Sequence, residues 1–210
     1  MADLVEIVGI GFEPRAFRRK GEVGKALFSR DESSRELRSR GYERHPYAHE
    51  YFSALIASLE GKLSPKQQNV IDDKHESYGE WFHDVLFVND THLTFFEGVE
   101  SLSQNHEELK YTKKTSFKLN TLKPETYYTI QDIFTANKKL GKHLWTREYH
   151  KLPQEIQQES GLYLPSQNQV LPVGRGNYVS NYVVDGSNYS GRASRGVVVG
   201  TKKNRQQTKT

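Results

Sequence analysis

The stretch PYAHEYFSALIASLEGKLSP, residues 46–65, decides the fold that the sequence predicts. Pro46 suits the first turn of a helix, and Gly61 is a typical helix end. Between them the apolar residues recur at helical spacing, at Tyr51, Phe52, Leu55, Ile56 and Leu59. Ser64 and Pro65 then predict the cap and first residue of a second helix. Because the turn between the helices is short, we expect an antiparallel helical hairpin.

The second helix of this hairpin is predicted to be long. Its apolar face continues through Val70, Ile71, Tyr78, Trp81, Phe82, Val85 and Leu86. This spacing turns Trp81 toward the first helix, so we expect its ring to lie in the core. A tryptophan buried there would contribute strongly to stability, because truncating such a residue typically costs about 3–5 kcal/mol.

Other segments predict strands and one further helix. Residues 4–10 and 92–96 have the apolar, β-branched or aromatic character of strands, and residues 111–122 alternate in the same way. A third helix is expected over residues 127–140, closed by Gly141. The predicted fold class is therefore α+β, a helical hairpin plus a small, mostly antiparallel sheet, with a C-terminal extended or hairpin arm.

Composition divides the chain into three parts. Residues 1–45 hold an N-terminal strand and a basic, loosely packed segment, in which Asp31 to Glu36 suit a short helix. Residues 46–160 form the α+β body. Residues 161–210 form a basic arm rich in Gly, Tyr, Asn and Ser. In the arm, Asp185-Gly186 is a typical hairpin turn, and residues 197–199 are expected to add a strand, in one interpretation to the sheet edge of a neighbouring chain.

The residue types that are absent narrow the function classes. The 210 residues include no cysteine, which excludes disulfides, thiolate metal sites and a thiol nucleophile. The first residues lack the basic segment and apolar run of a signal peptide, and no apolar run reaches the length of a membrane span. The sequence therefore predicts a cytoplasmic protein, or a virion protein made in a host cytoplasm, with no membrane contact.

The positive charge is concentrated in the arm. After Glu159 there are seven lysines and arginines against one aspartate, a net charge of +6. The remaining 23 basic and 25 acidic residues leave the rest of the chain at −2. Clustered cations favour polyanionic partners, because they displace the counterions condensed on a phosphate backbone. A solvated tail that binds nothing specific has the same composition.

Tyrosines that alternate with Asn, Gly and Arg make the arm a candidate binding segment. Aromatic rings stack on bases and guanidinium groups bind phosphate, whereas Tyr with Ser, Gly and Asn also suits protein interfaces. The candidate residues for binding nucleic acid or a partner are Arg175, Tyr178, Tyr182, Tyr189, Arg192, Arg195, Lys202, Lys203 and Arg205. Both interpretations stay open at this point.

Two weaker patterns suit metal chemistry. Glu76, Glu80 and His83 would share one helix face and could hold a metal ion, and His45 and His49 beside Glu50 have a spacing that suits zinc. No cofactor is predicted.

Asp90, Glu108 and Lys110 follow the order of two acids and a lysine with which nucleases hold Mg²⁺ and activate water. Ordinary surface charges are the favoured explanation of all of these patterns.

The favoured hypothesis is a non-enzymatic structural or assembly protein, of a virion or another multi-subunit complex. Its basic C-terminal arm would contact neighbouring subunits of a homo-oligomer, other protein partners or nucleic acid. The alternatives are a Mg²⁺-dependent nuclease that uses Asp90, Glu108 and Lys110, and an RNA- or DNA-binding accessory protein.

Overall fold

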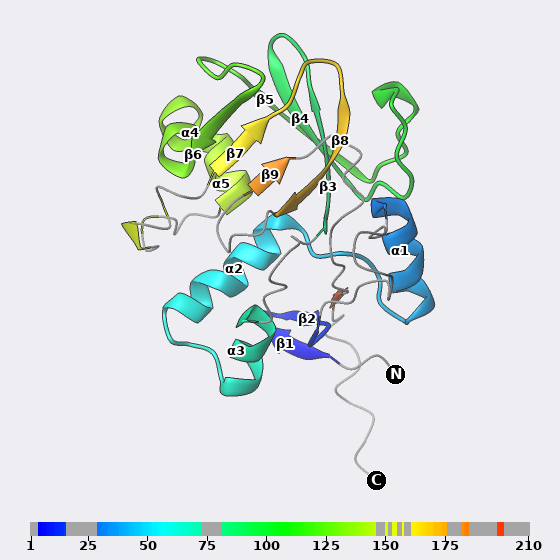
Figure 1. The fold of residues 1–210 in the computed structure, drawn as a ribbon, viewed down its shortest axis with the longest axis vertical. Coiled ribbons are helices and arrows are strands. Elements are labelled where there is room, and N and C mark those ends of the chain that lie inside the picture. Colours follow the sequence, from blue (N-terminus) through cyan, green and yellow to red (C-terminus); the bar gives the residue numbers. More distant parts are fainter. Residues whose placement is uncertain are drawn as a thin grey trace, which may run out of the picture.

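The computed structural model confirms an α+β fold with two separate sheets and five α-helices among the residues it describes. These are residues 4–15, 29–72, 81–145, 150, 153–154, 157, 161–175, 182–184 and 197–199. Figure 1 shows the larger sheet above helix α2 and the smaller sheet beside helix α3.

The larger sheet has seven strands in the order β5-β4-β3-β8-β9-β7-β6. Every pair is antiparallel except β7 with β9. The strands are β3 (Trp81–Val88), β4 (His92–Glu97), β5 (Lys113–Lys118), β6 (Thr126–Thr129), β7 (Gly161–Leu164), β8 (Val170–Arg175) and β9 (Tyr182–Val184). Because β8 lies between β3 and β9, the sheet joins the predicted body to the first part of the predicted arm.

The smaller sheet joins the two ends of the described chain. It contains β1 (Val5–Ile7), β2 (Ile10–Phe12) and β10 (Val197–Val199) in the order β1-β2-β10. Residues 4–10 were predicted as one strand, but Val8 and Gly9 both have positive φ and form a two-residue hairpin turn. Residues 197–199 form a strand as predicted, and β10 pairs with β2 of the same chain, which differs from the interpretation that placed it on a neighbouring chain.

The helices begin and end largely through local side-chain bonds. They are α1 (Arg30–Ser39), α2 (Ala48–Leu59), α3 (Pro65–Asp72), α4 (Ile130–Ala136) and α5 (Lys138–Trp145), with a short 3-10 helix η1 (His106–Glu108). Ser29 and Glu32 form a capping box at α1, and Ser64 and Gln67 bond in the same reciprocal way at α3. Gly61, with φ of +66°, ends α2 as the sequence predicts.

Two sequence predictions about helices were wrong. The second helix, which the structure describes as α3 up to Asp72, does not include Trp81–Val88, because these residues form strand β3; Trp81 is buried as expected. The run Trp81–Val88 is buried on both faces of the sheet, so helical and strand periodicity both fit it. The third helix is divided at Asn137 into α4 and α5, and Gly141 lies inside α5.

The core has two parts because the sheet is buried on both faces. Apolar residues of α2, α4 and α5 pack with one set of strand residues, which includes Phe82 and Leu86. The alternate residues Val85 and Phe87 face a smaller core, which the segment after β4 covers with Val99 and Leu109. No helix within the described ranges is long and apolar enough to cross a membrane.

Candidate functional site

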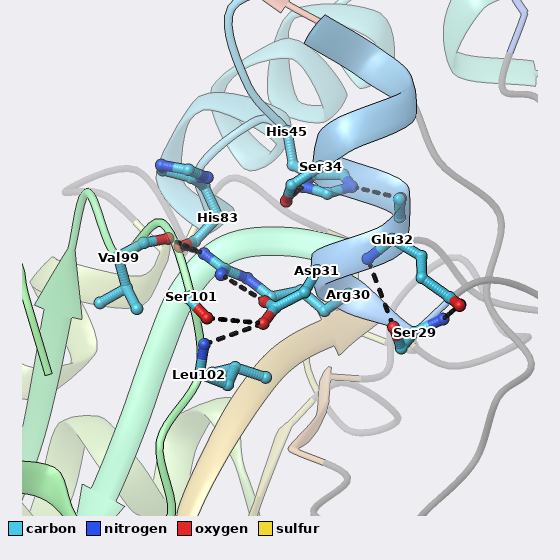
Figure 2. A network of polar contacts seen from close by, with 11 residues as sticks. Ser29, Arg30, Asp31, Glu32, Ser34, His45, His83, Val99, Ser101 and Leu102 are labelled. Carbon is cyan, nitrogen blue, oxygen red and sulfur yellow. Dashed lines mark hydrogen bonds and ion pairs between the residues drawn. The ribbon is translucent and has the colours of Figure 1, made fainter. Parts of the chain in front are cut away.

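A buried arginine lies where α1 meets the large sheet. Arg30 is the first residue of α1, and its side chain is fully buried. One guanidinium nitrogen, Nη2, donates to the carbonyl of His83 at 3.1 Å and to that of Val99 at 2.7 Å (Figure 2). Burial lowers the pKa of Arg30, because the charged form has lost its water. Arg30 therefore joins α1 to β3 and to the segment that follows β4.

Asp31 completes the same network on the outer side. Its carboxylate accepts bonds from the backbone N–H of Leu102 at 3.0 Å and from the hydroxyl of Ser101 at 3.3 Å (Figure 2). It also pairs with Arg30 at 3.3 Å. The first turn of α1 thus fixes the segment that covers the smaller core, so Arg30 and Asp31 stabilise the fold.

His45 binds two serines of α1. Its Nε2 lies 2.7 Å from the hydroxyl of Ser33, and its Nδ1 lies 3.4 Å from that of Ser34. Serine beside histidine at this distance also occurs in nucleophilic enzymes. Here His45 and Ser33 are both 0% exposed, so a substrate has no access to them. The contact fixes α1 to the chain that leads into α2.

The zinc hypothesis for His45 and His49 is not supported by their positions. His45 points to α1, whereas the ring of His49 stacks on Tyr47 with centroids 5.6 Å apart. Glu50 is occupied by a two-bond contact with Arg44 at 2.7 and 2.6 Å. Within the ranges that the structure describes, no group of three or more His, Asp or Glu side chains is placed to hold a metal ion.

Asp84 is a buried carboxyl beneath the start of α2. It lies in β3, only 3% of the residue is exposed, and its Oδ2 accepts the backbone N–H of Ala48 at 2.9 Å. A negative charge is favourable at a helix start, but burial raises the pKa of Asp84 to about 7. Near neutral pH this carboxyl is therefore divided between its charged and neutral forms.

His83 lies beside Asp84 in β3 and was predicted to bind metal with Glu76 and Glu80. His83 belongs to a strand and not to the predicted helix, and Glu76 and Glu80 lie outside the described residues. Burial, together with the charges of nearby arginines, lowers the pKa of His83 to about 3. The ring is therefore neutral, and its Nδ1 has no hydrogen-bond partner in the described part of the chain.

The structure places the nuclease candidates in two different loops. Asp90 is exposed in the turn between β3 and β4, whereas Glu108 and Lys110 belong to the segment between β4 and β5. Among the described contacts, no hydrogen bond or ion pair joins Asp90 to Glu108 or Lys110. The carboxylate of Glu108 accepts bonds from Ser103 at 2.9 Å and from Asn105 at 3.1 Å, so it stabilises the loop around η1.

Two of the arm residues predicted to bind a partner lie in described strands. Arg175 ends β8 and Tyr182 begins β9, and the two are paired across these strands. The others lie outside the described residues, namely Tyr178, Tyr189, Arg192, Arg195, Lys202, Lys203 and Arg205.

A lysine-rich surface was not predicted from the sequence. Residues 109–124 hold five lysines and no acid, and residues 133–145 hold three lysines and no acid. We call these eight exposed residues the lysine surface: Lys110, Lys113, Lys114, Lys118, Lys123, Lys138, Lys139 and Lys142. The sequence signal was the absence of Asp and Glu from both stretches.

Comparisons with protein-family models, with curated proteins and with solved structures gave no significant match.

Proposed function

We propose that the chain is a non-enzymatic structural or assembly protein, of a virion or another multi-subunit complex. Its basic C-terminal arm, residues 161–210, contacts neighbouring subunits or nucleic acid. The observation that carries this proposal is the attachment of a +6 arm to both sheets of the protein. Strands β7, β8 and β9 belong to the large sheet, and β10 belongs to the small one.

The cationic segments of the arm start or end at these strands. Arg195 precedes β10 by two residues, and Lys202 follows it by three. Strand β10 pairs with β2, which in turn leads to the exposed Arg15. Cations from distant parts of the sequence are thus within three residues of strands of one small sheet. A polyanionic partner would suit this arrangement, because several cations can bind a phosphate backbone together.

The nuclease alternative is a weaker proposal. Its candidate residues Asp90 and Glu108 come from different loops, one before and one after β4, and the buried polar groups around Arg30 are used in contacts between elements. No observation in the described residues favours catalysis over binding.

Size-exclusion chromatography with absorbance at 260 and 280 nm tests the proposal. The full chain should elute as an oligomer or with bound nucleic acid. A variant that lacks residues 200–210 loses Lys202, Lys203, Arg205 and Lys209 but keeps every described strand. It should bind nucleic acid more weakly and with a smaller salt dependence. The slope of log binding constant against log salt concentration should fall in magnitude by roughly 0.7–0.9 for each phosphate contact that is lost.

A full chain that elutes as a monomer, free of nucleic acid, and that binds neither an oligonucleotide nor itself would refute the assembly role. If the deletion variant binds nucleic acid with an unchanged salt slope, residues 200–210 do not take part in the contact.

A further inference from the structure

The edge strand β5 carries an unusual amount of positive charge. Lys114, Ser116 and Lys118 alternate along one face of this strand, opposite Phe96, Thr94 and His92 of β4. At about 3.4 Å per residue, the two lysines stand roughly 14 Å apart along the strand. Lysines at 110 and 123 flank the strand, and both are exposed. The outer edge of the large sheet is therefore a basic rim.

Two asparagine bonds fix the start of α5 beside this rim. The side-chain amide of Asn137 donates to the carbonyl of Lys118 at 2.8 Å. In return, the amide of Asn120 donates to the carbonyl of Ala136, also at 2.8 Å. These bonds place Lys138 and Lys139, the first residues of α5, next to the end of β5. Two lysine-rich stretches that are separate in the sequence thus meet at this rim, with Lys114 and Lys118 on one face of the sheet and α5 on the other.

The charge of this surface is largely free to attract a ligand. In the described part of the chain, Lys113 is the one member in an ion pair, with Glu97 at 2.7 Å. Exposed lysines that form no ion pair present their charge to solvent, and each can displace counterions from a polyanion.

An exposed aromatic ring lies at the same rim. Tyr111 is 43% exposed, and its ring rests on Phe96 with centroids 5.0 Å apart. The ammonium group of Lys114 lies 5.7 Å from the centre of the same Phe96 ring. A supported ring among cations suits the stacking of an unpaired base. This favours single-stranded nucleic acid over a membrane surface, which would need a larger apolar patch.

We propose that the lysine surface binds the phosphate backbone of single-stranded nucleic acid, with Tyr111 as a stacking platform. The inference rests on the proposed function in one respect, since it takes nucleic acid as a partner, but it assigns the contact to the body and not to the arm. Lysines on an edge strand also prevent edge-to-edge aggregation, and the experiment separates that role from binding.

The test compares three variants of the full chain by fluorescence anisotropy with a labelled oligo-dT of about 20 nucleotides over a range of salt concentrations. The first variant combines Lys114→Gln, Lys118→Gln, Lys138→Gln and Lys139→Gln. Loss of four phosphate contacts should lower the log–log salt slope by about 3. A matched control combines Arg35→Gln, Arg38→Gln, Lys62→Gln and Lys66→Gln, exposed cations on α1, on α3 and after α2, with the same change of net charge. Its slope should stay near that of the wild type.

The third variant, Tyr111→Leu, tests the stacking platform. It keeps an apolar side chain over Phe96 and should weaken binding about tenfold while leaving the salt slope unchanged. Melting temperatures check that all variants fold.

Several outcomes overturn the proposal. Equal loss of slope in the lysine variant and its control would mean that net charge alone governs binding. A lysine variant that aggregates but binds normally would assign the lysines to edge protection. Binding of anionic vesicles but not of oligonucleotide would assign the surface to membranes. If deletion of residues 200–210 abolishes binding and the lysine variant binds normally, the contact belongs to the arm and the lysine-surface proposal fails. If the lysine variant loses binding and the deletion does not, the lysine surface makes the contact and residues 200–210 do not.

Discussion

Replacement of Asp84 by asparagine perturbs the electrostatics at the start of α2 and little else. The amide oxygen of asparagine can still accept the Ala48 N–H bond, which is 2.9 Å long, but the side chain cannot ionise. Burial raises the pKa of the aspartate from 3.8 to about 7. The native protein therefore keeps this proton at pH values where the unfolded chain has released it.

The proton count gives the size and sign of the effect. Below about pH 4 both states of Asp84 are protonated, and the group causes no pH dependence. From pH 4 to pH 7 the contribution of Asp84 to the wild-type free energy of unfolding falls by about 1.4 kcal/mol per pH unit, because only the unfolded state ionises this group. Above pH 7 both states are charged and the deficit is constant at about 4 kcal/mol. The stability of Asp84→Asn relative to the wild type should therefore rise by about 4 kcal/mol from pH 4 to pH 8.

Urea unfolding between pH 4 and pH 8, followed by tryptophan fluorescence, measures this difference; both probes, Trp81 and Trp145, are buried. The pKa values of His83 and His143 are lowered to about 3 and about 4, so their contributions increase stability as pH rises. Both proteins contain these histidines, and subtraction removes their effect. A difference that does not change with pH, or that turns in favour of the wild type as pH rises, would show that native Asp84 is charged throughout.

Three further substitutions test individual contacts. Arg30→Met leaves two buried carbonyls without their donor and should cost about 2–4 kcal/mol in urea unfolding, whereas Arg35→Met, exposed on the same helix, should cost little. Gly141→Ala should lower the melting temperature despite the better helix propensity of alanine, because the new Cβ would lie 2.6 Å from the Phe134 ring; an unchanged or higher value contradicts this packing. When the pH is lowered from 7 to 5, the wild type should lose more stability in urea unfolding than His143→Phe, because the imidazole of His143 gains a proton in the unfolded chain and stays neutral in the native protein. Equal losses in the two proteins would refute a buried, neutral His143 ring.

Local signals made the helix termini predictable. The Ser64 cap of α3 and the Gly61 end of α2 depend on residues within four positions of each other, and the structure contains both. Strand β3 pairs with β4 in a local hairpin and also with β8, whose residues lie more than 80 positions later. A short apolar run can be a helix or a strand, and because Trp81–Val88 is buried on both faces, its periodicity did not distinguish the two. Gly141 was predicted to end a helix, but it lies inside α5, where the absence of a side chain makes room for the Phe134 ring. No local sequence pattern indicates this contact.

The candidate surfaces differ in the same way. The charge of the arm is a property of composition, so it was visible without a structure. The lysine surface depends on the bonds of Asn120 and Asn137, which connect residues 16 and 19 positions apart. The sequence assigned Lys138 and Lys139 to the end of a helix, where cations are favourable, but α5 begins with them. Their adjacency to Lys118 required the tertiary fold.

The small sheet also sets an order of events during synthesis. Strand β2 pairs with β10, and Val197 leaves the ribosome 185 residues after Phe12. At roughly 5–20 residues per second, this interval lasts about 10–40 s. By then all strands of the large sheet have been made, since the last of them ends at Val184. Until β10 has been made, the edge of β2 that will pair with it is exposed, but this edge is only three residues long. A strand of another nascent chain on the same mRNA would therefore pair with it only weakly.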